Sequence, residues 1–147
     1  MAQGQRTAEA VWTGSLVEGE GVIQSVGSGA IGNLPITWAA RTEAPGGKTS
    51  PEELIAAAHA ACYAMALSAT LGRQGNTPER LHVTATCGFE KDESGFRIAS
   101  MMLAVRGRVP GLDQNAFAEA ARKAEQGCPV SNALRAALRI EVDATLE

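Results

Sequence analysis

A long uncharged segment, Leu54 to Gly72 (LIAAAHAACYAMALSATLG), constrains the fold of this chain more than any other feature. It follows the sequence Ser50-Pro51-Glu52-Glu53. A serine cap, a proline at the first helical position and acids in the first turn are typical of the start of a helix. We therefore predict one helix from Pro51 to about Gly72.

This segment is about as long as a membrane span, but few of its residues are strongly apolar. It includes His59, Ser68 and Thr70, and neither a Lys/Arg cluster nor a Trp belt flanks it closely. We expect a central, buried helix of a soluble protein, with no membrane as partner. At helical spacing, the residues that share one face are Ile55, Ala58, His59, Cys62, Met65 and Ala69.

Three short strands are predicted before the helix, at 7–16, 21–26 and 34–40, followed by a loop at 41–50. After the helix, the predicted elements are a strand from Leu81 to Phe89, a hairpin turn at 91–95, a strand at 96–109, a helix capped by Asp113 that runs to about Gln126, a short helix at 129–136 and a strand at 138–146. The order βββ-α-ββ-α-(α)-β predicts one α+β domain over residues 1–147. Its strands are expected in antiparallel groups around the central helix that carries Cys62.

Charge and cysteine content limit the partners and the compartment. The formal net charge is −3 and no basic block is present, which argues against nucleic acid as a partner. Residues 1–7 are polar and lack the apolar core of a secretory signal, so we expect a cytoplasmic protein. In a reducing cytosol, a disulfide among the three cysteines is expected to be transient and catalytic.

The three cysteines differ in their local surroundings. Cys62 lies in the middle of the predicted helix, where a thiol normally packs as a small apolar group. Cys128 lies between Gly127 and Pro129, at the cap of a new helix, where free amides and the helix dipole stabilise a thiolate. Local signals alone thus favour Cys128 as the reactive thiol. Cys87 alternates with apolar residues on its strand and is expected to pack in the core.

Two longer motifs resemble a known family. The segments SPEELIAAAHAACYAMALS at 50–68 and GCPVSNAL at 127–134, together with RTE at 41–43, are similar to the OsmC/Ohr family of peroxide-reducing, stress-inducible bacterial proteins. The order of elements agrees over essentially the whole chain, including the VPG turn at 109–111. The sequence AAHAAC at 57–62 is more similar to the OsmC type than to the Ohr type.

The resemblance implies a cysteine-based hydroperoxide reductase. The peroxidatic cysteine of the family corresponds to Cys62, its resolving cysteine to Cys128 and its glutamate to Glu52. Its arginine corresponds to Arg41, as in OsmC-type proteins. The early segment in which Ohr-type proteins carry their arginine is TGSLVEGEG in this chain and contains no arginine. Organic hydroperoxides are the implied substrates, with hydrogen peroxide as a further one. No metal or organic cofactor is implied, and an external dithiol, such as a lipoyl group, is the expected reductant.

The implied chemistry assigns a task to each of these side chains. A Cys62 thiolate attacks a peroxide oxygen to give a sulfenic acid, and Cys128 then forms the Cys62–Cys128 disulfide. Arg41 supplies a cation that stabilises the thiolate and binds the peroxide oxygens. Glu52 holds the planar guanidinium by paired hydrogen bonds.

Two other functions stay open. The chain could be a stress-induced binding or structural protein without catalysis, although the presence of both Cys62 and Cys128 argues against this. His59 lies three residues before Cys62 on the same helix face, so a zinc site with Cys62 and Cys128 is a further hypothesis. No second Cys-x-x-Cys ligand pair supports that site. His59 could also act as a base for Cys62.

The predicted helix has a consequence for assembly. If it begins at Pro51, then Glu52 and Cys62 are ten residues apart, roughly 15 Å along the axis and about 80° around it. A glutamate side chain cannot span that distance to support an arginine that touches Cys62 of the same chain. Either the helix starts later, or Glu52 and Arg41 act across a subunit interface. We expect an obligate homodimer with two shared sites.

Overall fold

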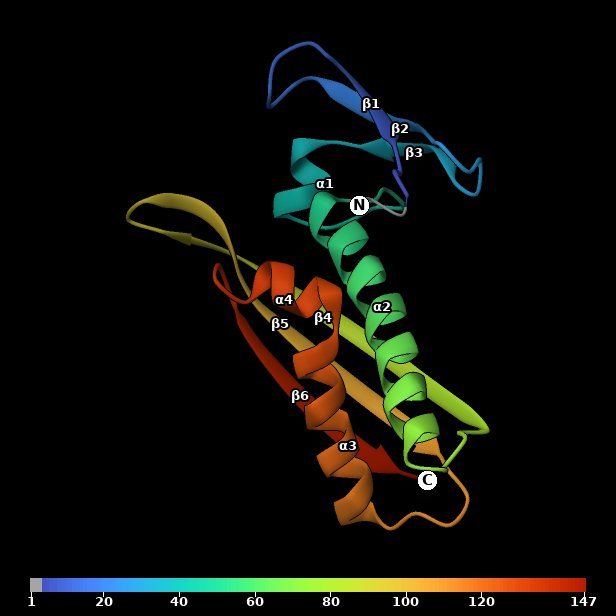
Figure 1. Ribbon diagram of the computed structural model, residues 1–147. Coiled ribbons are helices and arrows are strands. Elements are labelled where there is room, and N and C mark those ends of the chain that lie inside the picture. Colours follow the sequence, from blue (N-terminus) through green and yellow to red (C-terminus); the bar gives the residue numbers. More distant parts are fainter. Residues whose placement is uncertain (1–3) are drawn as a thin grey trace. The chain divides into compact units, whose positions relative to one another are not determined.

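The structure is a computed structural model that describes residues 4–147, so the first three residues of the polar start at 1–7 lie outside the described residues. The chain divides into two compact units, Met1–Pro51 and Glu52–Glu147. Figure 1 shows a small sheet in the first unit and a longer sheet with helices in the second. That residues 1–147 behave as one domain stays a prediction.

The first unit is an antiparallel sheet in the order β1-β2-β3, with strands Ala8–Thr13, Glu20–Val26 and Gly32–Ile36. The three predicted strands are confirmed, but the third ends earlier than expected. Helix α1, Trp38–Thr42, takes up residues predicted as strand and loop. The reason is local, because the Thr37 hydroxyl accepts a hydrogen bond from the Ala40 N–H at 3.1 Å and so caps a helix at this point.

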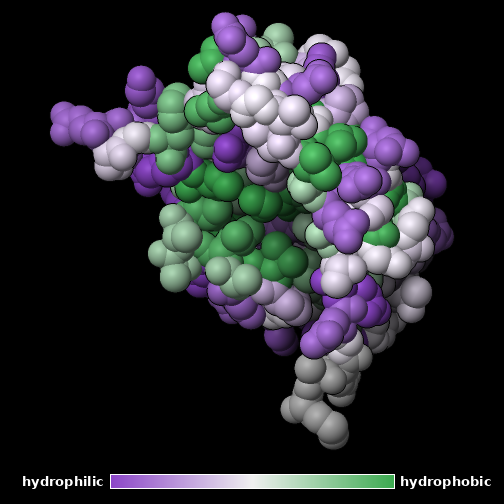
Figure 2. All heavy atoms as spheres, turned by 90° about the horizontal axis from the view of Figure 1, so that it is seen from above, coloured by the Kyte–Doolittle hydropathy of each residue, from purple (hydrophilic) through white to green (hydrophobic). Residues whose placement is uncertain are grey.

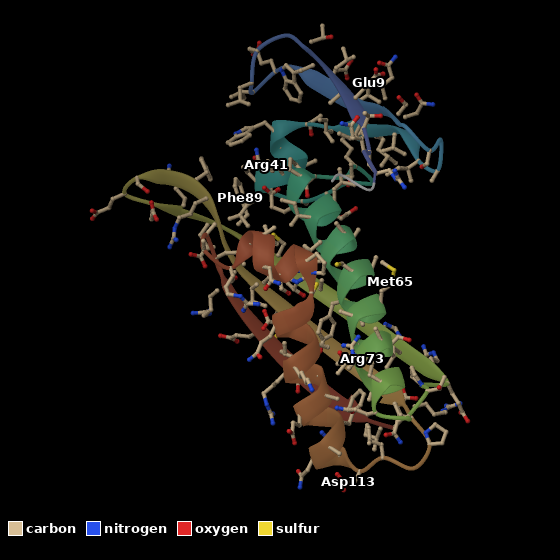
Figure 3. All side chains as sticks on the ribbon, in the orientation of Figure 1. Glu9, Arg41, Met65, Arg73, Phe89 and Asp113 are labelled. Atoms are coloured by element: carbon tan, nitrogen blue, oxygen red, sulfur yellow. The ribbon has the colours of Figure 1, made fainter. Side chains whose placement is uncertain are left out.

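The second unit contains the predicted long helix, confirmed as α2, Pro51–Arg73. Its buried residues are Glu52, His59, Tyr63, Leu67, Thr70 and Leu71. Ala58, Met65 and Ala69, predicted to share one face of a central, buried helix, are exposed, Met65 by 67 %. Figure 3 shows Met65 projecting outward from α2. The prediction was wrong here because α2 carries apolar residues on nearly all of its sides, so their spacing does not define the buried face. The bulky Tyr63 and Leu67 are the residues that face the core.

Within residues 4–147, α2 is the one helix that is long and apolar enough to cross a membrane, and 28 % of that segment is buried. A core helix of a soluble protein meets the same criteria of length and composition, so this finding is weak evidence for a membrane span.

The second sheet has the order β4-β5-β6, with strands Arg80–Asp92, Gly95–Arg108 and Arg139–Leu146. Strands β4 and β5 form an antiparallel hairpin, and Gly95 at its turn has a φ of 118°. Strand β6 runs parallel to β5, so the expectation of antiparallel pairing is wrong for this pair. Helices α3, Gln114–Gly127, and α4, Pro129–Leu134, supply the crossover that parallel strands require. The α+β class is confirmed.

Helices α2 and α3 lie on the same face of the second sheet (Figure 1). The predicted cap of α3 is confirmed, since the Asp113 carboxylate accepts a hydrogen bond from the Ala116 N–H at 2.8 Å. The Tyr63 hydroxyl donates to the Ala121 carbonyl at 2.9 Å and ties α2 to α3. The core between helices and sheet includes Leu67, Leu71, Met101, Leu103, Val105, Phe117, Ala120 and Ala124. This packing brings the end of α3 against the middle of α2.

Candidate active site

The packing of α2 against the junction of α3 and α4 brings two cysteines together. Cys62 lies in α2, and Cys128 is both the C-cap of α3 and the N-cap of α4. The two side chains are within hydrogen-bonding contact, and both thiols are free. Two neighbouring thiols are an arrangement from which a disulfide can form.

The two thiols differ in access. Cys62 is half-buried and lines a pocket of about 500 Å³, whose other walls include Met65, Pro129 and the two cationic residues Arg73 and Lys123. Cys128 has an exposed fraction of 0 %. A small molecule that enters this pocket therefore meets Cys62 first. Burial outweighs the local preference for Cys128 as the reactive thiol, because an attacking sulfur must touch its substrate.

The surroundings of Cys62 act on its pKa in both directions. Burial raises the pKa of the Cys62 thiol, and the neighbouring Cys128 thiol raises it further. The backbone N–H of Val130, in the first turn of α4, donates to the Cys62 sulfur and lowers the pKa. The balance is upward, so a thiolate near neutral pH requires additional positive charge near Cys62.

His59 lies in α2 and bonds to α4. Its Nε2 and the Ser131 Oγ share a hydrogen bond of 2.7 Å, and both residues have an exposed fraction of 0 %. Burial lowers the pKa of His59, with an opposing effect from the Glu125 carboxylate, so a neutral ring is favoured. One ring nitrogen is thus engaged by Ser131. In the described part of the chain, no group of three or more His, Cys, Asp or Glu side chains is placed to hold a metal ion.

Glu52 lies in the first turn of α2, near Cys87 of β4. Burial raises the pKa of the Cys87 thiol, and the Glu52 carboxylate raises it further. Because α2 does begin at Pro51, the separation of Glu52 and Cys62 along the helix, about 15 Å, stands. The Glu52 carboxylate thus acts electrostatically on Cys87, and Glu52 lies well apart from Cys62 along α2.

Cys87 packs against the core, as predicted. We expect Cys87→Ala to leave peroxide turnover intact and to lower the free energy of unfolding by roughly 1 kcal/mol, the typical effect of a small core truncation. Urea denaturation and a peroxide-consumption assay on the same preparation test both expectations. A native disulfide that contains Cys87 would contradict the pairing of Cys62 with Cys128.

Arg41 lies in the first unit, in the last turn of α1, while the other three predicted site residues lie in the second. Its guanidinium carbon lies 5.9 Å from the centre of the Trp38 ring. Arg41 and Trp38 line a mainly apolar pocket of about 260 Å³, with Trp12, Leu16 and Ile36 among its other walls. Figure 2 shows hydrophobic side chains gathered on the surface seen from above, bordered by hydrophilic ones. A role of Arg41 toward Cys62 stays a prediction.

Sequence reasoning missed four residues that contribute to these sites. Both tryptophans of the chain, Trp12 and Trp38, line the Arg41 pocket. Val130 contacts Cys62 through its backbone N–H, which any residue type can supply. Ser131 was visible as part of the motif GCPVSNAL, but nothing in the spacing pointed to His59 as its partner.

The chain combines an α+β fold with two neighbouring thiols, Cys62 and Cys128, and comparisons with known proteins show its family. The family model described as "OsmC-like protein" matches residues 44–143. Peroxiredoxin OsmC of Escherichia coli (strain K12) is 40 % identical over 136 residues, which cover 92 % of this chain and 94 % of that protein. Organic hydroperoxide resistance protein of Xanthomonas axonopodis pv. citri (strain 306) is 35 % identical over 104 residues, 70 % of each chain.

Solved structures of proteins with similar descriptions have the same fold as this chain. The organic hydroperoxide resistance protein OhrB of Bacillus subtilis superimposes with a TM-score of 0.73 at 26 % identity, over 95 % of this chain and 98 % of that one. A Legionella pneumophila protein described as organic hydroperoxide resistance protein OsmC gives a TM-score of 0.72 at 26 % identity, over 99 % of each chain. The chain belongs to the OsmC-like family, as its motifs predicted.

Proposed function

We propose that this chain is a thiol-dependent peroxidase that reduces organic hydroperoxides, and also hydrogen peroxide, in the cytoplasm. The observation that carries the proposal is the contact between Cys62, which lines a pocket, and the buried Cys128. Relatives named Peroxiredoxin OsmC and organic hydroperoxide resistance protein support a hydroperoxide-related role.

The proposed cycle has two steps on the protein. The Cys62 thiolate attacks one peroxide oxygen, the O–O bond breaks, and the leaving alkoxide takes a proton and departs as an alcohol. The Cys62 sulfenic acid then reacts with the Cys128 thiol to form the disulfide, and water leaves. The hydrogen-bonding contact between the two sulfurs supports this second step. An external dithiol, such as a lipoyl group, returns both cysteines to thiols.

A consumption assay tests the function directly. The reduced protein is mixed with cumene hydroperoxide and an excess of dithiothreitol, and the remaining peroxide is measured over time. We expect many equivalents of peroxide to be consumed per equivalent of protein. The proposal is wrong if folded, reduced protein consumes no more peroxide than dithiothreitol alone.

Arg41 is proposed to supply positive charge to Cys62, in addition to Arg73 and Lys123, which line the Cys62 pocket. Arg41→Ala should raise the pKa of Cys62 and lower the second-order rate with peroxide much more than it lowers stability. Arg41→Lys should restore only part of the rate, because an ammonium keeps the charge but loses the planar fork. Stopped-flow measurements on reduced protein at several pH values test this. A near-normal rate in Arg41→Ala would remove Arg41 from the site.

We further propose that the enzyme is an obligate homodimer and that Glu52 of one chain serves the Cys62 site of the other. The separation of about 15 Å along α2 motivates this, because it prevents Glu52 from acting on a group bound at its own Cys62. Mixing inactive Cys62→Ser with inactive Glu52→Ala subunits under exchange should regenerate sites that hold both wild-type residues. The peroxidase activity of verified mixed dimers is the measurement.

The matched control mixes wild-type subunits with the double variant Cys62→Ser/Glu52→Ala. In a shared site, each mixed dimer of this kind is inactive, because its remaining Cys62 faces the chain in which alanine replaces Glu52. In a site within one chain, half of the activity remains. No recovery in the first mixture, or a fully active monomer by light scattering, would count against the shared site.

A further inference from the structure

One buried hydrogen bond connects the start of α4 directly to α2. It joins His59 Nε2 to Ser131 Oγ at 2.7 Å, and both residues have an exposed fraction of 0 %. His59 lies three residues before Cys62 in α2, about one helical turn away. Ser131 lies three residues after Cys128 and directly after Val130. The bond therefore lies beside both contacts that the Cys62 sulfur makes with this segment.

Those two contacts depend on the position of the first turn of α4. The Val130 N–H donates to the Cys62 sulfur, and the Cys128 side chain lies within hydrogen-bonding contact of it. Helix α4 has only six residues, too few for its internal hydrogen bonds to keep it in place. Its far end is tied to α3 instead, because Arg135 pairs with the Glu125 carboxylate at 2.8 Å and donates to the Glu125 carbonyl at 3.3 Å.

The His59–Ser131 bond is well suited to hold the near end. Both partners are fully buried, so water does not readily replace the bond when one partner is removed. The hydroxyl left behind would be an unpaired polar group in the interior, and a shift of α4 toward solvent would relieve that cost. Such a shift would carry Val130 and Cys128 away from Cys62.

We propose that His59 is a positioning residue that, through Ser131, holds the first turn of α4 against α2, so that the Val130 N–H stays on the Cys62 sulfur and Cys128 stays within reach of it. This inference rests on the proposed function. It assigns His59 neither a metal nor the role of a base, because the nitrogen that faces α4 is engaged by the Ser131 hydroxyl.

Loss of the bond has two separate consequences for the chemistry. The Cys62 thiolate loses an amide donor, so its pKa rises and its reaction slows at pH values below that pKa. The Cys62 sulfenic acid also persists longer before it reacts with the Cys128 thiol. A second hydroperoxide can then oxidise it, so that Cys62–SOH and ROOH give the sulfinic acid Cys62–SO₂H and the alcohol ROH.

The test compares His59→Leu, His59→Gln, Ser131→Ala and the double variant His59→Leu/Ser131→Ala. Glutamine can present an amide group near the Nε2 position and bond to Ser131, whereas leucine fills similar space without a polar atom. His82→Leu is the matched control, because His82 is the other histidine of the chain and lies exposed on β4. Alkylation of Cys62 by iodoacetamide is followed against pH by mass spectrometry, and sulfinic acid at Cys62 is quantified after cumene hydroperoxide treatment.

We expect alkylation of Cys62 in His59→Leu to shift upward by about one pH unit, and its rate below the pKa to fall about tenfold. Sulfinic acid should accumulate in His59→Leu. In His59→Gln, the alkylation profile and the sulfinic acid level should both return most of the way to those of wild type. The double variant should be no worse than His59→Leu, because the two side chains act through one bond. His82→Leu should behave as wild type.

The outcomes separate this inference from the proposed function. If wild type consumes peroxide while His59→Leu and Ser131→Ala keep its alkylation profile and form no extra sulfinic acid, His59 has no positioning role and the peroxidase proposal stands. If wild type consumes no peroxide but alkylation still shifts in His59→Leu, the positioning role stands and the peroxidase proposal is wrong. Should His59→Leu not fold, Ser131→Ala, which removes a single oxygen atom, decides by the same two readouts. Additive effects in the double variant would also overturn the inference.

Discussion

Cys62→Ser is expected to abolish peroxide reduction. A serine hydroxyl stays protonated at neutral pH and cannot pass through a sulfenic acid, so neither step of the cycle remains. The volume change is small and Cys62 is half-buried at a pocket, so the fold should persist. The peroxide-consumption assay should give the rate of dithiothreitol alone, while circular dichroism and the unfolding midpoint stay near those of wild type.

Cys87→Ser is the matched control for this variant, because Cys87 is also half-buried but packs against the core instead of the Cys62 pocket. Its turnover should be retained. Turnover by Cys62→Ser above the dithiothreitol background would remove Cys62 from the first step, and Cys128 would then be the first candidate to replace it.

Cys128→Ser should stop turnover in a different way. Cys62 still lines its pocket and still has the Val130 N–H, so it should react once with one equivalent of peroxide. Because no resolving thiol follows, the sulfenic acid should persist and be trapped by dimedone at Cys62, as seen by mass spectrometry. Wild type under the same conditions should give the Cys62–Cys128 disulfide and little adduct.

The result that would reverse these roles is also specific. If Cys128 is oxidised first in Cys62→Ser, at a rate comparable with wild type, then the signal at the helix cap predicted the reactive thiol better than burial did. An exposed fraction of 0 % at Cys128 is the reason we expect the opposite.

The sequence predicted those elements whose signals are local. The segment Ser50 to Glu53 carries a cap, a proline and two acids, and α2 begins at Pro51 as expected. Asp113 likewise caps α3 as predicted. The direction of β6 was missed because a period of two reports which side of a strand is buried and says nothing of whether its neighbour runs parallel or antiparallel. Helix α1 was missed because it is short and overlaps the segment 34–40, whose sequence pattern predicts a strand.

The site was predictable only where a motif carried it. Cys62 and Cys128 were named from their motifs, and their contact required α3 and α4 to fold back onto α2. Met65 is exposed and lines the Cys62 pocket, and the spacing of apolar residues alone leaves its orientation undecided because small residues lie all around α2. The link from His59 to Ser131 joins residues far apart in the chain, and a single sequence holds no signal for it.

The segment between the two cysteines has a mechanical consequence. It contains the second half of α2 together with β4, β5 and α3. A Cys62–Cys128 bond would therefore close most of the second unit into a covalent ring, with the first half of α2, α4 and β6 outside it. A ring of this size restricts the unfolded chain by roughly 4 kcal/mol in the chain-entropy account. The oxidised form would then be the state that best resists heat and proteases, and the reductant would restore catalysis by returning the protein to its more easily unfolded form.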